Sequence, residues 1–216
     1  MRMNYRTVAG GGEAELVIEK SQFIGYAAPA DTEEAALEFI QTIRKKHRDA
    51  THNVPAYVLG ENNVIQRFSD DGEPSGTAGV PMLEVLKKED VRDVVLVVTR
   101  YFGGIKLGTG GLVRAYTKAA KLALDAAGIV TRQLHQVVRV EIDYTLLGLL
   151  QNQLRALEYA LKDTLYTEVV TLLVWVPAEA VTDFCAQCIE WTSGRCAVEP
   201  QELAYLEKSA QGRTDC

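Results

Sequence analysis

Glycines and basic residues are concentrated just after an apolar run in the middle of the chain. Five glycines fall within nine residues, at Gly103, Gly104, Gly108, Gly110 and Gly111. Glycine permits positive φ angles and lets the backbone approach another group closely. If a helix begins in this segment, its free N–H groups and its dipole favour an anion. The segment therefore predicts an anion-binding loop.

Basic side chains surround the glycine-rich segment. Arg100 and Lys106 precede the expected helix. The helix carries three more at spacings of i, i+4 and i+7, which share one helical face: Arg114, Lys118 and Lys121. We predict that these residues and the glycines form an anion- or RNA-binding surface. The alternative is that the glycines only permit tight strand–helix packing and that the basic row is simply solvated.

Neither standard phosphate-binding motif is present in this segment. Gly103 and Gly108 have the spacing of a P-loop, but Thr109 occupies the position of its lysine. Gly108 and Gly110 match the start of a dinucleotide-binding motif, but Val113 stands at its third glycine. The segment, including Thr109, is therefore better described as a basic, glycine-lined surface than as a nucleotide pocket.

A polar loop and a histidine earlier in the chain are possible contributors to the site. Asp70, Asp71 and Glu73 could bind Mg²⁺ through their carboxylates, but Asp-Gly and Glu-Pro are common turn sequences, and a turn is favoured. His52 could exchange a proton near neutral pH, but no partner is evident, so a structural role is favoured. We predict no metal, no cofactor and no catalytic residue.

Composition and charge limit the class of protein. The chain has 216 residues, of which 47% are hydrophobic and 24% charged, an ordinary globular balance. A net charge of -6 argues against a protein coated with nucleic acid but allows a local basic patch. No signal peptide or membrane-spanning run is evident, so we expect a cytoplasmic protein that does not enter a membrane. Cys185 and Cys188 share a helical face and have no second pair, which favours structural cysteines.

Hydrophobic periodicity predicts the elements that must position these residues. In the first part we expect strands at 15–19, 22–26, 52–59, 64–68 and 91–101, and helices at about 32–47, 81–88 and 109–127. The first helix is expected to bury Leu37, Ile40 and Ile43. The apolar run at 91–101 is typical of a central strand. Gly128 is expected to end the third helix.

After Gly128 a second series of strands and helices is expected. We expect strands at 138–144, 163–166, 167–176 and 197–205, and helices at 146–159 and 178–192. The order β-α-β-β-α-β is the ferredoxin-like split motif. We therefore predict an α+β protein with one domain at 1–130, a ferredoxin-like domain at 134–208 and a tail at 209–216.

Four segments together resemble the bacterial YigZ-like branch of the IMPACT family: Lys20–Ile24, Ala50–Asn53, Asp70–Gly79 and Val98–Gly108. The last two are close to the defining signature of the family. The resemblance covers roughly residues 10–130. The C-terminal part resembles the DUF1949-type domain that bacterial members append.

The resemblance implies a fold and a biological setting. It implies a first domain like domain 2 of ribosomal protein S-five, an α/β sandwich that is also the fold of domain IV of elongation factor G. The second domain would resemble domain V of that factor. Eukaryotic relatives regulate translation under amino-acid starvation by competing for the activator of an initiation-factor kinase. They use an N-terminal extension that this chain lacks, so that partner is not expected here. The resemblance implies no catalytic residues.

Three classes of function remain, and one is favoured. The favoured hypothesis is a cytosolic, non-enzymatic factor of translation or the stress response that binds RNA or the ribosome. The alternative is an ATP-dependent small-molecule kinase or another phosphate-binding enzyme. The same pair of folds occurs in the galactokinase–homoserine kinase–mevalonate kinase group. The segment Leu107–Gly111 loosely resembles the phosphate-binding loop of those enzymes. The third is an adaptor that binds an acidic protein partner through the same surface.

Overall fold

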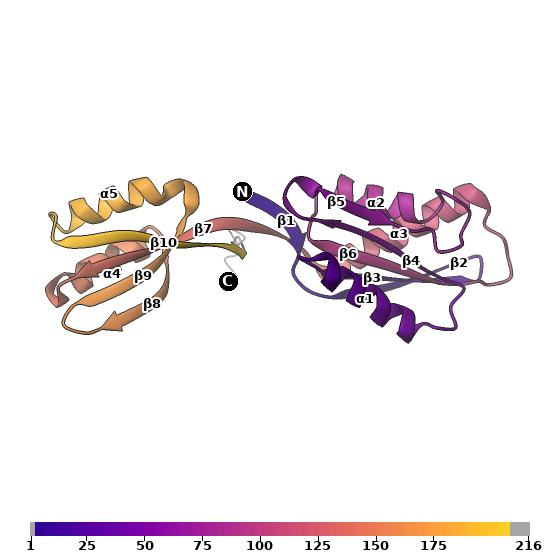
Figure 1. Ribbon diagram of the computed structural model, residues 1–216, viewed down its shortest axis with the longest axis horizontal. Coiled ribbons are helices and arrows are strands. Elements are labelled where there is room, and N and C mark those ends of the chain that lie inside the picture. Colours follow the sequence, from indigo (N-terminus) through magenta and orange to yellow (C-terminus); the bar gives the residue numbers. More distant parts are fainter. Residues whose placement is uncertain (1–2, 208–216) are drawn as a thin grey trace, which may run out of the picture. The chain divides into compact units, whose positions relative to one another are not determined.

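The computed structural model describes residues 3–207, and the chain divides into two compact units (Figure 1). The first unit contains Tyr5–Thr131, and the second continues from Arg132. The predicted tail at 209–216 lies outside the described residues. In the part of the chain that the structure describes, no helix is long and apolar enough to cross a membrane.

The first unit is built on one antiparallel sheet with the strand order β2-β3-β6-β4-β5. Its strands are β2 (Gly12–Ile18), β3 (Ser21–Pro29), β4 (His52–Leu59), β5 (Ile65–Phe68) and β6 (Val94–Tyr101). The central position predicted for the apolar run is confirmed, because β6 lies between β3 and β4. Leu96 and Val98 pack on one face of the sheet, while Val95 and Val97 pack on the other.

Helices cover both faces of this sheet (Figure 1). One face is covered by α1 (Glu33–Lys46), and the other by α2 (Gly79–Lys88) and α3 (Gly108–Ala127). Thr32 caps α1, since its hydroxyl accepts a hydrogen bond from the N–H of Ala35 at 3.2 Å. The expectation that Leu37 is buried was wrong: it is 49% exposed, and Ala36 faces the sheet instead.

His47 ends α1 and lies buried between two tyrosines. Its Nε2 lies 2.7 Å from the hydroxyl of Tyr26, and its Nδ1 lies 2.9 Å from the hydroxyl of Tyr101. Burial, together with the neighbouring Lys46 charge, lowers the pKa of His47 below its ordinary value. The folded protein therefore favours the neutral imidazole.

We expect the free energy of unfolding to fall as the pH is lowered through about 6.5, the ordinary pKa of histidine. Below that pH the unfolded chain binds a proton at His47 that the folded chain resists, so protons shift the equilibrium towards unfolding. Urea unfolding at pH 7.5 and 5.5 measures the change. His47→Gln should lose less stability between the two pH values than the natural chain. Equal losses would contradict the assignment.

The second unit has the predicted ferredoxin-like order, which confirms the α+β class. Its elements are β7 (Ile129–Ile142), α4 (Leu147–Ala156), β8 (Ala160–Tyr166), β9 (Val170–Pro177), α5 (Val181–Trp191) and β10 (Cys196–Glu207). The strand order is β8-β9-β7-β10, with every one of these pairings antiparallel. Side chains of α4 and α5 share one core with the sheet.

Two details of the sheet differ from the sequence-based expectation. The first strand, β7, begins at Ile129 rather than at 138, and β1 (Asn4–Val8), which was not predicted, pairs with it. The polar residues at 131–133 and 135–136 conceal the strand pattern in the first half of β7. Tyr144, expected in the strand, lies in a short 3₁₀ turn and is exposed, because the chain turns at Asp143 before α4.

The cysteines of the second unit lie in or beside its core. Cys188 is fully buried, and burial raises the pKa of its thiol to about 12. Burial also raises the pKa of Cys185, and both thiols are free. Thiols held in the protonated form are poor nucleophiles and metal ligands, which supports the structural interpretation. Cys216 lies outside the described residues.

Candidate anion-binding site

Strand register places a charged residue under α3. Phe23 of β3 and His52 of β4 both lie opposite Arg100 of β6. Because side chains alternate along a strand, Arg100 shares the face of Leu96 and Val98, which α3 covers. Arg100 is only 5% exposed. It therefore does not belong to the exposed basic surface predicted from the sequence.

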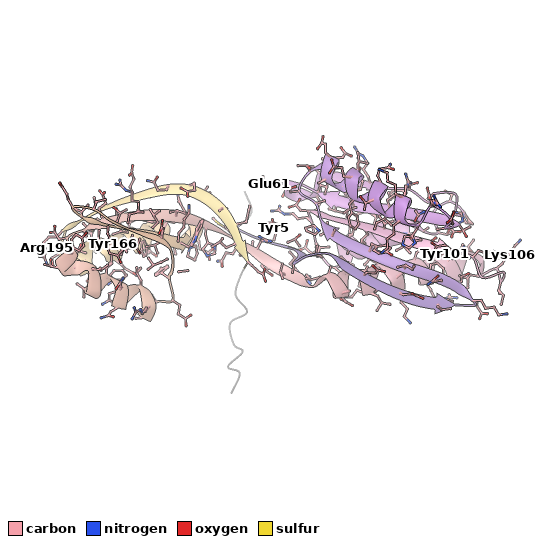
Figure 2. All side chains as sticks on the ribbon, turned by 90° about the horizontal axis from the view of Figure 1, so that it is seen from below. Tyr5, Glu61, Tyr101, Lys106, Tyr166 and Arg195 are labelled. Atoms are coloured by element: carbon pink, nitrogen blue, oxygen red, sulfur yellow. The ribbon has the colours of Figure 1, made fainter. Side chains whose placement is uncertain are left out.

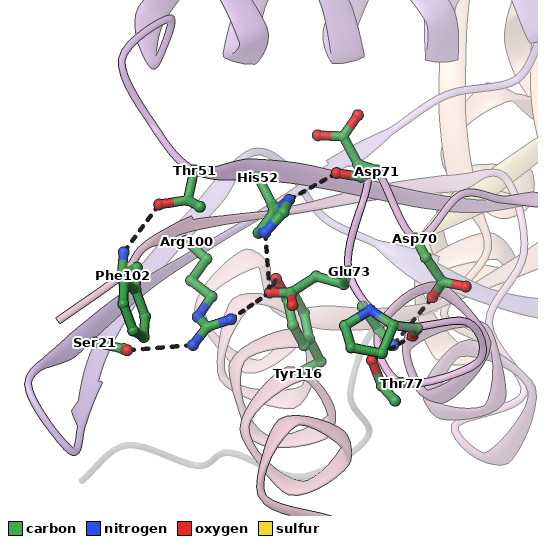
Figure 3. Close-up of polar contacts among 12 residues, drawn as sticks. Ser21, Thr51, His52, Asp70, Asp71, Glu73, Thr77, Arg100, Phe102 and Tyr116 are labelled. Atoms are coloured by element: carbon green, nitrogen blue, oxygen red, sulfur yellow. Dashed lines mark hydrogen bonds and ion pairs between the residues drawn. The ribbon is translucent and has the colours of Figure 1, made fainter. Parts of the chain in front are cut away.

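The charge of Arg100 is compensated by Glu73 (Figure 3). Its Nη1 lies 2.7 Å from Glu73 Oε1, and its Nη2 donates to the hydroxyl of Ser21 at 3.4 Å. The hydroxyl of Tyr116 on α3 donates to the same Glu73 oxygen at 2.8 Å. Burial and the Glu73 charge hold the pKa of Tyr116 far above its usual range, so this hydroxyl remains a donor.

The polar loop between β5 and α2 delivers Glu73 to this position. Asp70 closes the loop, because its carboxylate accepts three backbone N–H groups, from Gly76, Ala78 and Gly79, at 2.8–3.1 Å. Asp71 binds Arg44 at 3.0 Å and the N–H of Asn53 at 2.7 Å. Both aspartates therefore hold the loop together. Among the described residues no group of three or more acidic, histidine or cysteine side chains is arranged to hold a metal ion.

His52 connects the loop to the buried ion pair. Its Nδ1 lies 2.7 Å from the carbonyl oxygen of Asp71. A carbonyl can only accept, so we assign the ring proton to Nδ1. The other nitrogen, Nε2, then faces Glu73 Oε1 at 3.8 Å. The structure thus provides the partner for His52 that the sequence did not reveal.

The glycines of the predicted loop have different structural roles. Gly103 packs against the β2–β3 turn, where a Cβ atom would lie 2.0 Å from the carbonyl carbon of Lys20. Gly104 and Gly108 have positive φ angles of 84° and 68°. Gly110 and Gly111 lie in the first turn of α3. Close packing therefore explains Gly103, and the positive φ angles explain Gly104 and Gly108.

A pocket of about 400 Å³ opens beneath the first turn of α3. Its floor and walls are formed by Thr51, His52, Glu73, Pro74, Arg100, Phe102, Lys106, Leu107, Gly108, Thr109 and Leu112. No side chain caps the N-terminus of α3, so its first N–H groups are available to a ligand. Arg100 and Glu73 neutralise each other. The remaining charge at the pocket is that of Lys106 and the helix dipole, which favours an anion.

The predicted basic row is shorter than expected. Lys106, Arg114 and Lys118 are exposed, and none has an ion-pair partner in the described part of the chain. In Figure 2, Lys106 lies beyond Tyr101 at one extremity of the first unit. Lys121 is already paired, with Asp125 at 2.6 Å and Glu89 at 3.3 Å. Three of the five predicted basic residues thus remain free to bind an anion.

Sequence reasoning missed the groups that complete the buried network. Tyr116, Ser21 and Thr51 were not assigned to the site. Thr51 accepts a hydrogen bond from the N–H of Phe102 at 3.0 Å and so fixes the start of the glycine segment. Strand alternation could have shown that Arg100 points into the core. A buried arginine requires an acid, and Glu73 was already a candidate.

Comparison with known proteins identifies the family. The Impact N-terminal domain matches residues 19–124, and the domain of unknown function DUF1949 matches residues 140–195. The IMPACT family member YvyE of Bacillus subtilis is 50% identical over 209 residues, which span 97% of this chain and 96% of that protein. This chain belongs to the IMPACT family. The family member YigZ of Escherichia coli is 37% identical over 179 residues, or 82% of this chain and 88% of YigZ.

A solved structure also matches this IMPACT family chain over most of its length. That crystal structure of a hypothetical protein is 33% identical, covers 94% of this chain and 99% of its own, and has a TM-score of 0.60. The family resemblance deduced from the sequence is therefore confirmed, together with the fold class. Membership of the family supports a role in translation regulation or stress.

Proposed function

We propose that this protein is a translation- or stress-related factor that binds RNA, free or on the ribosome, through the open end of α3. The observation that carries the proposal is the set of unpaired basic residues just before α3 and along its first half: Lys106, Arg114 and Lys118. Phosphates are the anions that RNA presents, and helix N-termini together with lysine and arginine bind them.

The kinase alternative gains no support from the acidic loop. Its first two carboxylates, Asp70 and Asp71, are occupied by hydrogen bonds within the loop and to neighbouring elements. Glu73 is occupied at one oxygen by Arg100 and Tyr116. The loop thus serves to build the pocket, and RNA binding is the function that we propose.

Co-sedimentation with ribosomes at low and high salt tests the proposal. We expect the protein to pellet with ribosomes, or to bind free RNA, at low salt and to be released as the salt concentration rises. If neither ribosomes nor free RNA retain the protein at low salt, the proposal fails. Retention that survives nuclease treatment would instead indicate a protein partner.

We expect the double substitution Arg114→Ala/Lys118→Ala to reduce the salt dependence of RNA binding. Each phosphate contact contributes roughly 0.7 to the slope of log K against log salt for single strands, so the slope should fall by roughly 1.4. Fluorescence anisotropy with a uridine decamer measures it. The matched control is Lys45→Ala/Lys88→Ala, two exposed lysines on α1 and α2. Equal slopes for both double variants would exclude this face of α3.

A further inference from the structure

We propose that the pocket beneath α3 binds one ribonucleotide unit of the RNA strand and recognises its ribose hydroxyl. The phosphate would lie at Lys106 and the first turn of α3, the base on Phe102, and a hydroxyl at Glu73 Oε2. The inference rests on the proposed RNA binding and adds a preference for RNA over DNA. Three features of the pocket support it.

The first feature is the unused oxygen of Glu73. Its Oε1 accepts hydrogen bonds from Arg100 and Tyr116 and faces His52. Its Oε2 accepts none from the described residues and is not sealed from solvent, although the side chain is only 3% exposed. An ionised carboxylate accepts hydrogen bonds and cannot donate them. The pocket floor therefore attracts a hydroxyl group and repels a phosphate.

The second feature is the distribution of charge between floor and rim. Lys106 and the uncapped end of α3 lie at the rim, beside Gly108 and Thr109. A phosphate is favoured there and disfavoured at Glu73, which lines the same pocket. The ligand that matches both must carry a phosphate and a hydroxyl in the same unit. A ribonucleotide has this pair, whereas a deoxyribonucleotide inside a strand lacks the free hydroxyl.

The third feature is an aromatic wall. Phe102 is 47% exposed and lines the pocket, with Leu107 and Leu112 on the same lining. The guanidinium carbon of Arg100 lies 5.5 Å from the centre of its ring, a cation–π distance. Bases stack on exposed aromatic rings with little dependence on sequence. A volume of about 400 Å³ is within the range of small-ligand sites, which suits one nucleotide.

Binding of a uridine decamer and a deoxyuridine decamer, compared by fluorescence anisotropy, tests the inference. The two probes differ only in the 2′-hydroxyl groups. Hydrogen bonds to a charged group correspond to roughly tenfold or more in affinity, so RNA should bind at least about tenfold more tightly. Phe102→Ala should weaken RNA binding by roughly tenfold. Phe68→Ala is the matched control, because Phe68 is also 47% exposed but does not line the pocket.

The substitution Glu73→Gln tests the hydroxyl contact directly. Arg100 and Tyr116 both donate to the Oε1 position, so the amide oxygen should take that place and the NH₂ group should face the pocket. The preference for RNA should then shrink, because the ribose hydroxyl exchanges a hydrogen bond to a charged carboxylate for a weaker one from a neutral amide. Thermal unfolding verifies that this variant folds. If it does not fold, the ratio of the affinities of the natural chain for the RNA and DNA decamers tests the inference.

The possible outcomes separate this inference from the proposed function. Equal affinity for the two decamers, with binding that still weakens with salt, overturns the ribonucleotide pocket and leaves RNA binding by the basic face intact. A Phe102→Ala variant that binds RNA as well as Phe68→Ala also overturns the pocket. Binding of neither decamer at low salt overturns both.

Discussion

Replacing Glu73 by alanine is expected to lower the free energy of unfolding by about 3–5 kcal/mol. The substitution leaves Arg100, which is 5% exposed, without the carboxylate that compensates its charge. It also removes the acceptor of the Tyr116 hydroxyl, which is fully buried. Urea unfolding followed by circular dichroism measures the change.

Two further variants establish that the buried charge causes this loss. Glu84→Ala removes an exposed carboxylate that pairs with Lys87 at 2.9 Å and should change stability by less than about 1 kcal/mol. The double variant Glu73→Ala/Arg100→Met removes both charges and should be more stable than Glu73→Ala alone. If the double variant is the less stable of the two, the explanation by an uncompensated charge is wrong.

The second large effect is expected at Gly103. In Gly103→Ala the new Cβ would lie 2.0 Å from the carbonyl carbon of Lys20 and 2.4 Å from the backbone nitrogen of Ser21. Both neighbours are backbone atoms of the β2–β3 turn and cannot rotate away. The loop or the turn must therefore shift, at a cost of about 3 kcal/mol, the upper part of the usual range for overpacking. Chemical unfolding measures the loss.

Gly110→Ala is the matched control within the same glycine-rich segment. A Cβ at Gly110 would meet only the Arg114 side chain, at 3.6 Å, and the residue is helical. Alanine is the better helix former, so this variant should be as stable as the natural chain or up to about 1 kcal/mol more stable. Gly103→Ala with the same stability as Gly110→Ala would show that the turn can move.

Most of the fold could be predicted because its signals are local. A few neighbouring residues are enough to recognise three of these signals: the helix cap at Thr32, the apolar run of β6 and the glycine, Gly128, that ends α3. The split motif of the second unit follows from the order of its elements. The unpredicted β1 is short and polar, and its strand conformation depends on pairing with β7, which is more than a hundred residues away in the sequence.

The site could be predicted only in part because its contacts are not local. The glycines and lysines at the start of α3 are recognisable in the sequence, and the anion site there stays a prediction. The partner of Arg100 lies 27 residues earlier, and the second donor to Glu73 lies 43 residues later. Spacing along the sequence does not identify such partners, although strand alternation indicates that Arg100 itself is buried. Lys121 is different, because its closer partner is Asp125, four residues later on the same helix, and only its second partner, Glu89, is distant in the sequence.

Glu73 is shared between the core and the pocket. One of its oxygens is held by β6 and α3, and its loop is closed by three backbone hydrogen bonds to Asp70. The loop cannot swing away from the pocket without separating a buried ion pair. The Glu73 side of the pocket is therefore in place before any ligand arrives, and a ligand that contacts it loses little affinity to ordering that side.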